Sequence, residues 1–204
     1  GGKAGLLRNL DTTNMLEGLP IKIANSDTFP LGDSNGVEID SGCAYPSPVL
    51  TAEIDELDAY LPHISEGINK AAHNEFVCLG MAPNDVVEPM SAIIHAIALS
   101  ADDTKTLHPE QTRVVWSPRS NAAPYGNTAQ ATVLDILGVP LALGTDWVAS
   151  GSMNMLRELR CADELNTNYY DKRFSDADLW KMVTTNAALA TGAEKAVGLL
   201  KVGM

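Results

Sequence analysis

The chain has 204 residues, enough for one domain with a substantial core, and 45% of them are hydrophobic against 20% charged. Its formal net charge of −12, with 14 basic and 26 acidic residues and no local basic cluster, opposes binding to a nucleic-acid backbone. The sequence shows neither an apolar run long enough to span a bilayer nor a signal-peptide pattern at its start. We therefore expect a globular protein with no nucleic-acid or membrane partner.

The cysteines are an odd set of three, Cys43, Cys78 and Cys161, without a CxxC pair. An odd number of cysteines without a CxxC motif is typical of reduced thiols. We expect all three to be free, mostly as core fillers, in a cytoplasmic protein.

The regular elements become readable only after the first quarter of the chain. Residues 1–48 hold short apolar pieces, at 6–10 and 21–24, separated by turn residues. Beyond them, apolar runs predict strands at 58–64, 89–99, 113–117 and 139–146. Helical patterns cover 66–76, 128–137, 153–165 and a last helix that begins with a capping box at Ser175 and ends near Ala190. Strands that alternate with helices predict parallel βα units.

Polar side chains follow each of these four strands. The first is followed by His63 and Glu66, the second carries His95, the third runs into the SPRSN segment 117–121, and the fourth ends in Gly-Thr-Asp146. Neighbouring parallel strands end at the same edge of a sheet, so these groups are expected to converge on one rim. Imidazole and carboxylate are suitable zinc ligands, and a glutamate close to a ligand can shuttle protons for a metal-bound water.

Each of these residues also has a structural explanation when it is taken singly. His95 lies within an apolar run and fits a satisfied core histidine, Glu66 fits a helix N-terminus, and Asp146 fits a turn cap. For His73 and His108 we prefer a surface position. The ordered set at successive strand ends is more specific than any of its members.

In this ordered set the chain, from about residue 60 to 203, resembles the metal-dependent amidohydrolase superfamily, in its cytosine/guanine deaminase and chlorohydrolase-like branch. The resemblance matches His63 and Glu66 to the H-x-x-E after the fifth barrel strand, and His95 to the histidine of the sixth. It matches segment 117–121 to the loop after the seventh strand and Asp146 to the G-T-D of the eighth. After Asp146, Ser150-Gly151-Ser152 and Glu158 match the family's Ser-x-Ser pattern and the glutamate that follows it.

The resemblance implies a (β/α)8 TIM-type barrel, of which residues 1–204 would form a single partial domain with the later strands only. It implies a divalent metal, zinc or alternatively iron, held by His63 and Asp146. Glu66 and Asp146 would move protons and His95 would polarise the substrate. The implied reaction is hydrolysis of a C–N bond in a small cyclic or amide/amidine substrate by metal-activated water, as in a deaminase or amidohydrolase.

One departure from the family pattern concerns the first barrel strand. Such enzymes carry a metal-binding H-x-H pair there, and this sequence has no H-x-H. A complete barrel also needs about 250 residues. We therefore expect the N-terminal strands to lie outside this sequence, which leaves open whether the segment alone binds metal. Exposed strand edges would be covered by that missing chain or by a second copy in a homo-oligomer.

Four further residues are candidates for substrate binding. Trp116 and Trp147 flank the predicted rim, where an indole can stack on a planar ring or simply pack against loops. Arg119 can bind a carboxylate with two hydrogen bonds or pair with a nearby acid, and Asn121 belongs to the same segment.

Two alternatives to an enzyme remain. One is a non-catalytic remnant of such a hydrolase that acts as a binding or interaction module. The other is a doubly wound α/β binding domain, which the absence of a glycine-rich phosphate loop disfavours.

Overall fold

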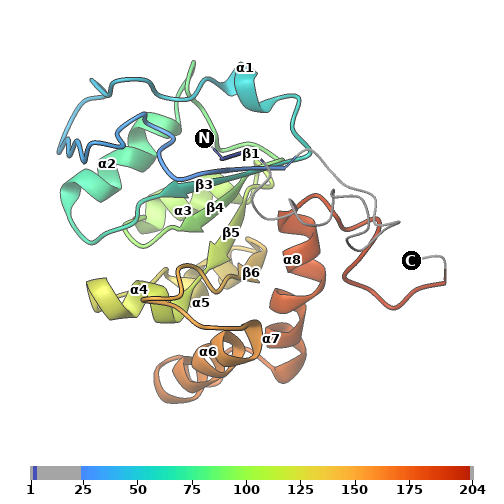
Figure 1. Ribbon diagram of the computed structural model, residues 1–204. Helices are drawn as coiled ribbons and strands as arrows, with labels where there is room; N and C mark the ends of the chain where they lie inside the picture. The colour runs from blue at the N-terminus through green and yellow to red at the C-terminus, as the bar shows by residue number, and fades with distance from the viewer. Residues whose placement is uncertain (1, 4–23, 203–204) are drawn as a thin grey trace.

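A single twisted sheet organises the molecule, which we describe from a computed structural model for residues 2–3 and 24–202 (Figure 1). Its strands follow the chain in order, and only the first pair is antiparallel. They are β1 (Gly2–Lys3), β2 (Ala24–Asp27), β3 (Ala59–Ile64), β4 (Ala92–His95), β5 (Arg113–Trp116) and β6 (Leu141–Leu143). The apolar piece expected at 6–10 lies outside the described residues, as do residues 21–23 of the piece expected at 21–24, whose last residue, Ala24, begins β2.

Helices fill the connections between the parallel strands, and three more follow the last strand. They are α1 (Thr51–Ile54), α2 (Lys70–Leu79), α3 (Ala101–Leu107), α4 (Pro118–Tyr125), α5 (Ala131–Ile136), α6 (Met155–Tyr169), α7 (Asp176–Val183) and α8 (Thr185–Ala190). Among the described residues, no helix has the length and apolar character that crossing a membrane requires.

The two faces of the sheet bury different clusters, because successive side chains of a strand point to opposite sides. On the outer face, Tyr60, Ile93, Val114 and Trp116 join the large core formed with the surrounding helices. On the inner face, a smaller cluster of Leu61, Ile94 and alanines packs against α8, which Figure 1 shows on the side of the sheet opposite α2 and α3. Both faces of the parallel strands are therefore covered, as their continuous apolar runs predict.

The predicted βα order is confirmed, although several boundaries differ. The helix expected from residue 66 begins at Lys70, after Asn69 caps it, and the last predicted helix is broken at Thr184 into α7 and α8. Ser175 forms the predicted capping box with Asp178. The SPRSN segment, expected as a loop, is the first turn of helix α4, because Pro118 occupies the first helical position, where its missing N–H costs nothing.

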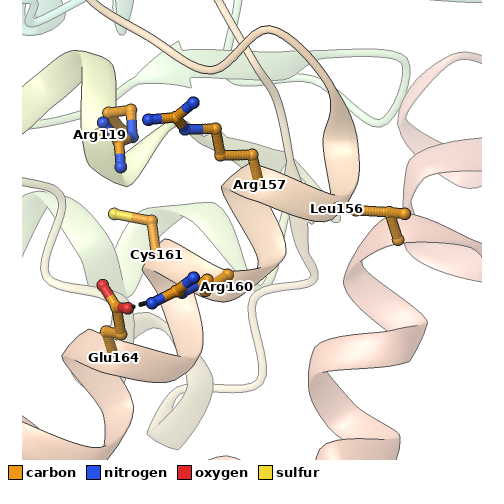
Figure 2. A pocket seen from close by; sticks show the side chains of 6 residues that line it. All are labelled: Arg119, Leu156, Arg157, Arg160, Cys161 and Glu164. Atoms are coloured by element: carbon orange, nitrogen blue, oxygen red, sulfur yellow. Dashed lines mark hydrogen bonds and ion pairs between the residues drawn. The ribbon is translucent and has the colours of Figure 1, made fainter.

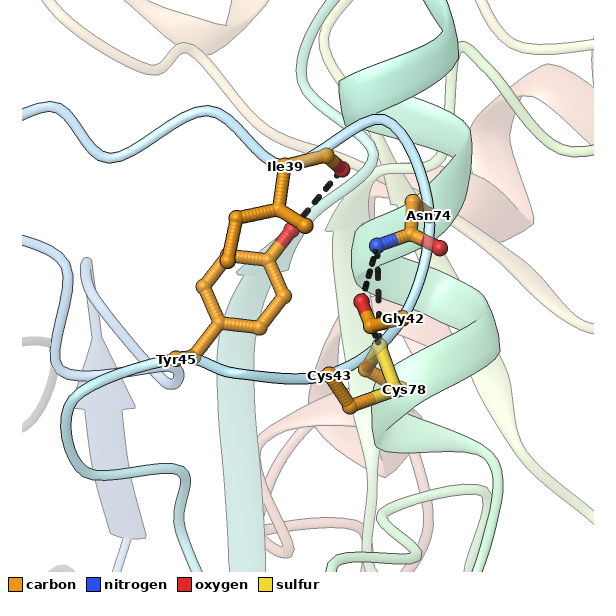
Figure 3. The surroundings of a disulfide bond; sticks show 6 residues. All are labelled: Ile39, Gly42, Cys43, Tyr45, Asn74 and Cys78. Atoms are coloured by element: carbon orange, nitrogen blue, oxygen red, sulfur yellow. Dashed lines mark hydrogen bonds between the residues drawn. A yellow bond between two sulfur atoms is a disulfide. The ribbon is translucent and has the colours of Figure 1, made fainter.

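The expectation of three reduced cysteines is wrong for two of them. Cys43 and Cys78 form a disulfide that ties the loop before α1 to helix α2 (Figure 3). Cys161 is free. The spacing of the cysteines in the sequence did not predict this pairing, because the two partners are 35 residues apart and meet only when the loop folds across α2. The cytoplasmic assignment rested on reduced thiols and loses that support.

The same bridge is embedded in local hydrogen bonds. The Nδ2 group of Asn74, one turn before Cys78, donates to the carbonyl of Gly42 at 2.8 Å, and the Tyr45 hydroxyl donates to the carbonyl of Ile39 (Figure 3). The loop is thus held to α2 by side chains as well as by the covalent bond.

Candidate functional site

Three potential metal ligands meet at the carboxyl ends of the parallel strands. His63 comes from β3, His95 ends β4, and Asp146 follows β6. One ligand atom of each lies within 4.8 Å of those of the other two. The structure therefore brings together the two predicted histidines and the aspartate, although His63 and Asp146 are 83 positions apart in the sequence.

His63 is oriented by the neighbouring strand β2. Its Nδ1 lies 3.0 Å from the carbonyl oxygen of Asp27, an acceptor, so Nδ1 carries the hydrogen and Nε2 keeps a lone pair. The Asp27 carboxylate accepts a hydrogen bond from the Tyr60 hydroxyl at 3.0 Å. Burial raises the pKa of Tyr60, and so does the adjacent Asp27, which keeps this phenol protonated as a donor.

His95 is oriented by a chain of hydrogen bonds that starts at a tryptophan. The indole N–H of Trp116, which can only donate, donates to Thr128 Oγ1 at 2.7 Å. The same oxygen accepts from Asn121 Nδ2 at 3.1 Å, so the Asn121 Oδ1 must face the other way, 2.9 Å from His95 Nδ1. His95 Nδ1 therefore carries the hydrogen, and Nε2 presents a lone pair.

The Nε2 side of the His95 ring faces a glutamate. The Glu66 Oε2 lies 3.4 Å from His95 Nε2, close enough for an electrostatic contact but not aligned as a hydrogen bond. The Tyr125 hydroxyl donates to the other Glu66 oxygen at 3.1 Å. Burial, followed by the charge of Glu66, raises the pKa of Tyr125 to about 12, so it remains a donor at neutral pH.

Asp146 is positioned by the turn after β6. Ser120 Oγ is hydrogen-bonded to both its Oδ2 and Ser150 Oγ. The glycine before this turn is required by close packing, since a Cβ on Gly144 would lie 2.7 Å from Val115 Cγ1.

Left-handed backbone geometry marks several positions on this rim. Ser65, His95 and Asp146 have φ values of 57°, 77° and 52°, in a region that residues other than glycine seldom occupy. Such strain persists only where surrounding contacts enforce it and clusters at functional sites. It turns each strand end sharply, which directs the side chains of His95 and Asp146 to the rim.

The predicted substrate-binding residues are distributed over several environments. Trp116 is fully buried on the outer face of β5, where it packs against Tyr170 and Phe174, so it takes the packing role rather than the substrate contact. Trp147 is 71% exposed on the loop after Asp146. Asn121 is fully buried and orients His95 instead of facing solvent.

Arg119 also lies away from the rim. Its backbone N–H donates to the buried Glu158 Oε1 at 3.0 Å, and its side chain lines an outer cavity beside α6. His73 and His108 are outside the cluster, with His73 Nε2 at 2.9 Å from Asp103 Oδ2 and His108 exposed, as expected.

An inner cavity of about 390 Å³ opens beside the three ligands. His63 and Asp146 line its polar end, whereas Leu61, Ile94 and Met155 are among the apolar residues along its wall. A mainly apolar cavity of this size with a few converging polar groups suits a small cyclic ligand.

The donor set fits a divalent cation. Two imidazoles and one carboxylate are the ligands that a catalytic zinc site uses, with one position left for a water. Both histidines bind a hydrogen-bond acceptor through Nδ1, the outer contact that usually orients a metal-binding imidazole. His95 Nε2 is buried and has no hydrogen-bond partner among the described residues, which a bound cation would remedy.

Sequence reasoning missed the supporting residues Asp27, Thr128 and Glu75. Strand β2 reads Ala-Asn-Ser-Asp and has no apolar alternation, so only its position beside β3 reveals Asp27 as the orienter of His63. Glu75 accepts the Ser65 N–H at 2.9 Å beneath the rim, and burial raises its pKa to about 7.

Comparisons with known proteins agree with this geometry. The Amidohydrolase family profile matches residues 52–204. A 5-methylthioadenosine/S-adenosylhomocysteine deaminase from Thermoanaerobacter pseudethanolicus is 29% identical over 150 residues, which cover 69% of this chain and 35% of that protein. A protein of the same name from Teredinibacter turnerae is 32% identical over 126 residues, 60% of this chain and 28% of that one.

Solved structures show the same fold. A zinc-bound adenosine deaminase from Xanthomonas campestris superposes with a TM-score of 0.64 at 24% identity, over 74% of this chain and 37% of that one. A mutant atrazine chlorohydrolase from Arthrobacter aurescens, complexed with zinc and atraton, gives a TM-score of 0.62 at 16% identity, over 88% and 40%.

The chain therefore belongs to the Amidohydrolase family. Its parallel strands β2–β6 form part of a (β/α)8 TIM-type barrel, as the resemblance implied. The chain spans about a third of the length of the curated relatives it matches.

Proposed function

We propose that this chain supplies the later strands of a metal-dependent amidohydrolase that hydrolyses the C–N bond of a small cyclic substrate. The observation that carries the proposal is the convergence of His63, His95 and Asp146 within 4.8 Å beside an apolar cavity. Family membership supports the reaction type, because the named relatives are deaminases.

In this proposal the three converging side chains hold a divalent metal, with zinc favoured by the donor set. His95 then acts as a third ligand through Nε2 instead of polarising the substrate, because its Nδ1 hydrogen is already donated to Asn121. When bound, the metal supplies Lewis-acid activation of water and of the substrate. The sequence has no H-x-H, so we propose that further ligands come from strands outside these 204 residues.

Glu66 is the proton carrier of the proposed mechanism. Its Oε2 faces the ligand cluster and its Oε1 is fixed by Tyr125, so the carboxylate can accept a proton from the attacking water and return it to the leaving amine. The oxygen of water forms a bond with the ring carbon, the C–N bond breaks, and ammonia leaves.

The substrate class proposed is an aminated purine or a related planar heterocycle. Support comes from the relatives named as adenosine-type deaminases and from a cavity whose walls are apolar and whose polar groups gather at one end. We propose that the exposed Trp147, on the loop that follows Asp146, stacks on such a ring.

Ammonia release tests the proposal. The zinc-loaded full-length protein that carries this segment should release ammonia from an adenosine-type nucleoside, and His63→Ala should abolish the release while His108→Ala preserves it. Absence of hydrolysis across aminated purines, pyrimidines and triazines would favour the non-catalytic remnant.

A further inference from the structure

A second cavity lies on the outer side of helix α4, against helix α6. It has a volume of about 590 Å³ and is lined by Arg119, Leu156, Arg157, Arg160, Cys161 and Glu164 (Figure 2). None of these residues lines the inner cavity beside the ligand cluster, so the two are separate. Leu156 is 71% exposed on the edge of this outer cavity.

Positive charge is concentrated here. Three of the six arginines of the sequence line the cavity, although the whole chain carries a net charge of −12. Only Arg160 is neutralised directly, since its Nε lies 2.8 Å from Glu164 Oε1. In the described part of the chain, neither Arg119 nor Arg157 has a side-chain ion pair within 4 Å.

The remaining polar groups do not cancel this charge. Burial raises the pKa of the Cys161 thiol, which therefore stays neutral at pH 7. Glu158 lies behind Arg119 and attracts it, but its Oε1 accepts the Arg119 backbone N–H, and in the described part of the chain the two side chains form no ion pair within 4 Å.

Arg119 has an unsatisfied donor that points to a missing partner. Its Nε is buried and has no hydrogen-bond partner among the described residues. A buried charged donor is costly unless it is paired, so such groups usually have a partner in the functional state. Figure 2 shows the guanidinium of Arg157 extending from the first turn of α6 toward that of Arg119. Two guanidinium forks at one cavity are suited to an oxyanion, which can accept several hydrogen bonds from each.

We propose that this outer pocket is an anion-binding site for a phosphate group, either free or carried by a small metabolite, with Arg119 and Arg157 as its main ligands. Arg160 completes the positive rim while it is paired with Glu164.

The site is coupled to the rim through helix α4. Ser120, which bonds Asp146, and Asn121, which bonds His95, directly follow Arg119 in the first turn of α4. A bound phosphate fixes that turn from outside, so occupancy should change the environment of His95.

Calorimetric titration with inorganic phosphate tests this site. The buffer contains a chelator, so that no metal can bind the anion, and chloride keeps the ionic strength constant. The wild-type chain should bind one phosphate saturably. Arg157→Gln should weaken binding by about tenfold or more, the loss expected for a charge-assisted hydrogen bond. Arg173→Gln, which removes an arginine paired with Asp135 elsewhere, should bind as wild type.

Two further arms complete the test. Arg119→Gln should also weaken binding, and thermal unfolding reports whether that variant remains folded; Arg157 is exposed, so its variant is the safer one. Malonate should bind more weakly than phosphate. The proposal is overturned if wild type shows no saturable phosphate binding, if Arg157→Gln binds equally well, or if malonate is preferred, which would make this a carboxylate site.

Discussion

The Nδ1 nitrogen of His95 lies 2.9 Å from Oδ1 of Asn121, and this contact decides what the other ring nitrogen offers. Asn121 Nδ2 donates to Thr128 Oγ1, which directs its Oδ1 to His95. The hydrogen on Nδ1 is therefore donated to Asn121. The Nε2 nitrogen faces the other two potential ligands with a lone pair that can bind a cation.

Replacement of Asn121 by leucine should therefore weaken metal binding. Loss of an outer-shell partner of a metal-binding histidine typically costs about tenfold to a hundredfold in affinity. Zinc affinity can be measured by competition with a chelating dye, and nitrogen NMR of the His95 ring should show a mixture of tautomers. Asn168→Leu on the exposed side of α6 is the matched control. An unchanged affinity would show that Asn121 has no orienting role.

Glu66→Gln should separate catalysis from metal binding. The amide still accepts a hydrogen bond from Tyr125 but cannot carry a proton, so turnover by the zinc-loaded full-length protein should fall by about a hundredfold to ten-thousandfold. The zinc content should not change. Glu110→Gln, at an exposed position, controls for the lost charge. Turnover within a few-fold of wild type would remove Glu66 from the mechanism.

Glu75 predicts a pH dependence of stability. Burial raises its pKa from 4.5 to about 7 in the folded state, so the folded protein holds a proton that the unfolded chain has already released. This contribution to stability is complete below about pH 4.5 and disappears as the pH rises to 7. Glu75→Gln should therefore match wild type at pH 4.5 and be more stable at pH 8, by up to about 3 kcal/mol.

Urea unfolding at both pH values measures this difference. Glu110→Gln removes the same charge from an exposed position and should show a smaller gain. If both variants gain equally at pH 8, general charge repulsion rather than burial of Glu75 explains the effect.

The Cys43–Cys78 bridge should stabilise the chain. It closes a loop across a sequence separation of 35, and reduction or the double serine variant should lower the free energy of unfolding by about 2–4 kcal/mol. Denaturant unfolding with and without reductant measures the loss. Cys161→Ser, which leaves the bridge intact, should respond to reductant as wild type does; a stability of the wild type that is independent of reductant would contradict the bridge.

Much of the barrel portion was predictable because parallel strands and capping boxes leave local signals. The strand ends at His63, His95 and Asp146 could be placed on one rim from order alone. What the sequence did not reveal depends on contacts between distant segments: the outward orientation of Trp116, the support of His63 by Asp27, and the disulfide. Alternation of apolar and polar residues identifies a strand. The register in which that strand pairs with its neighbours decides which of its two faces lies against the core.

Cobalt(II) titration of the full-length protein that carries this segment, followed by its visible absorption spectrum, tests the central claim most directly. If His63, His95 and Asp146 form a metal site, one cobalt ion should bind per chain, and His63→Ala, His95→Ala and Asp146→Asn should each reduce the affinity strongly, whereas His73→Ala should not. Absence of saturable binding, or binding that survives all three substitutions, would contradict it.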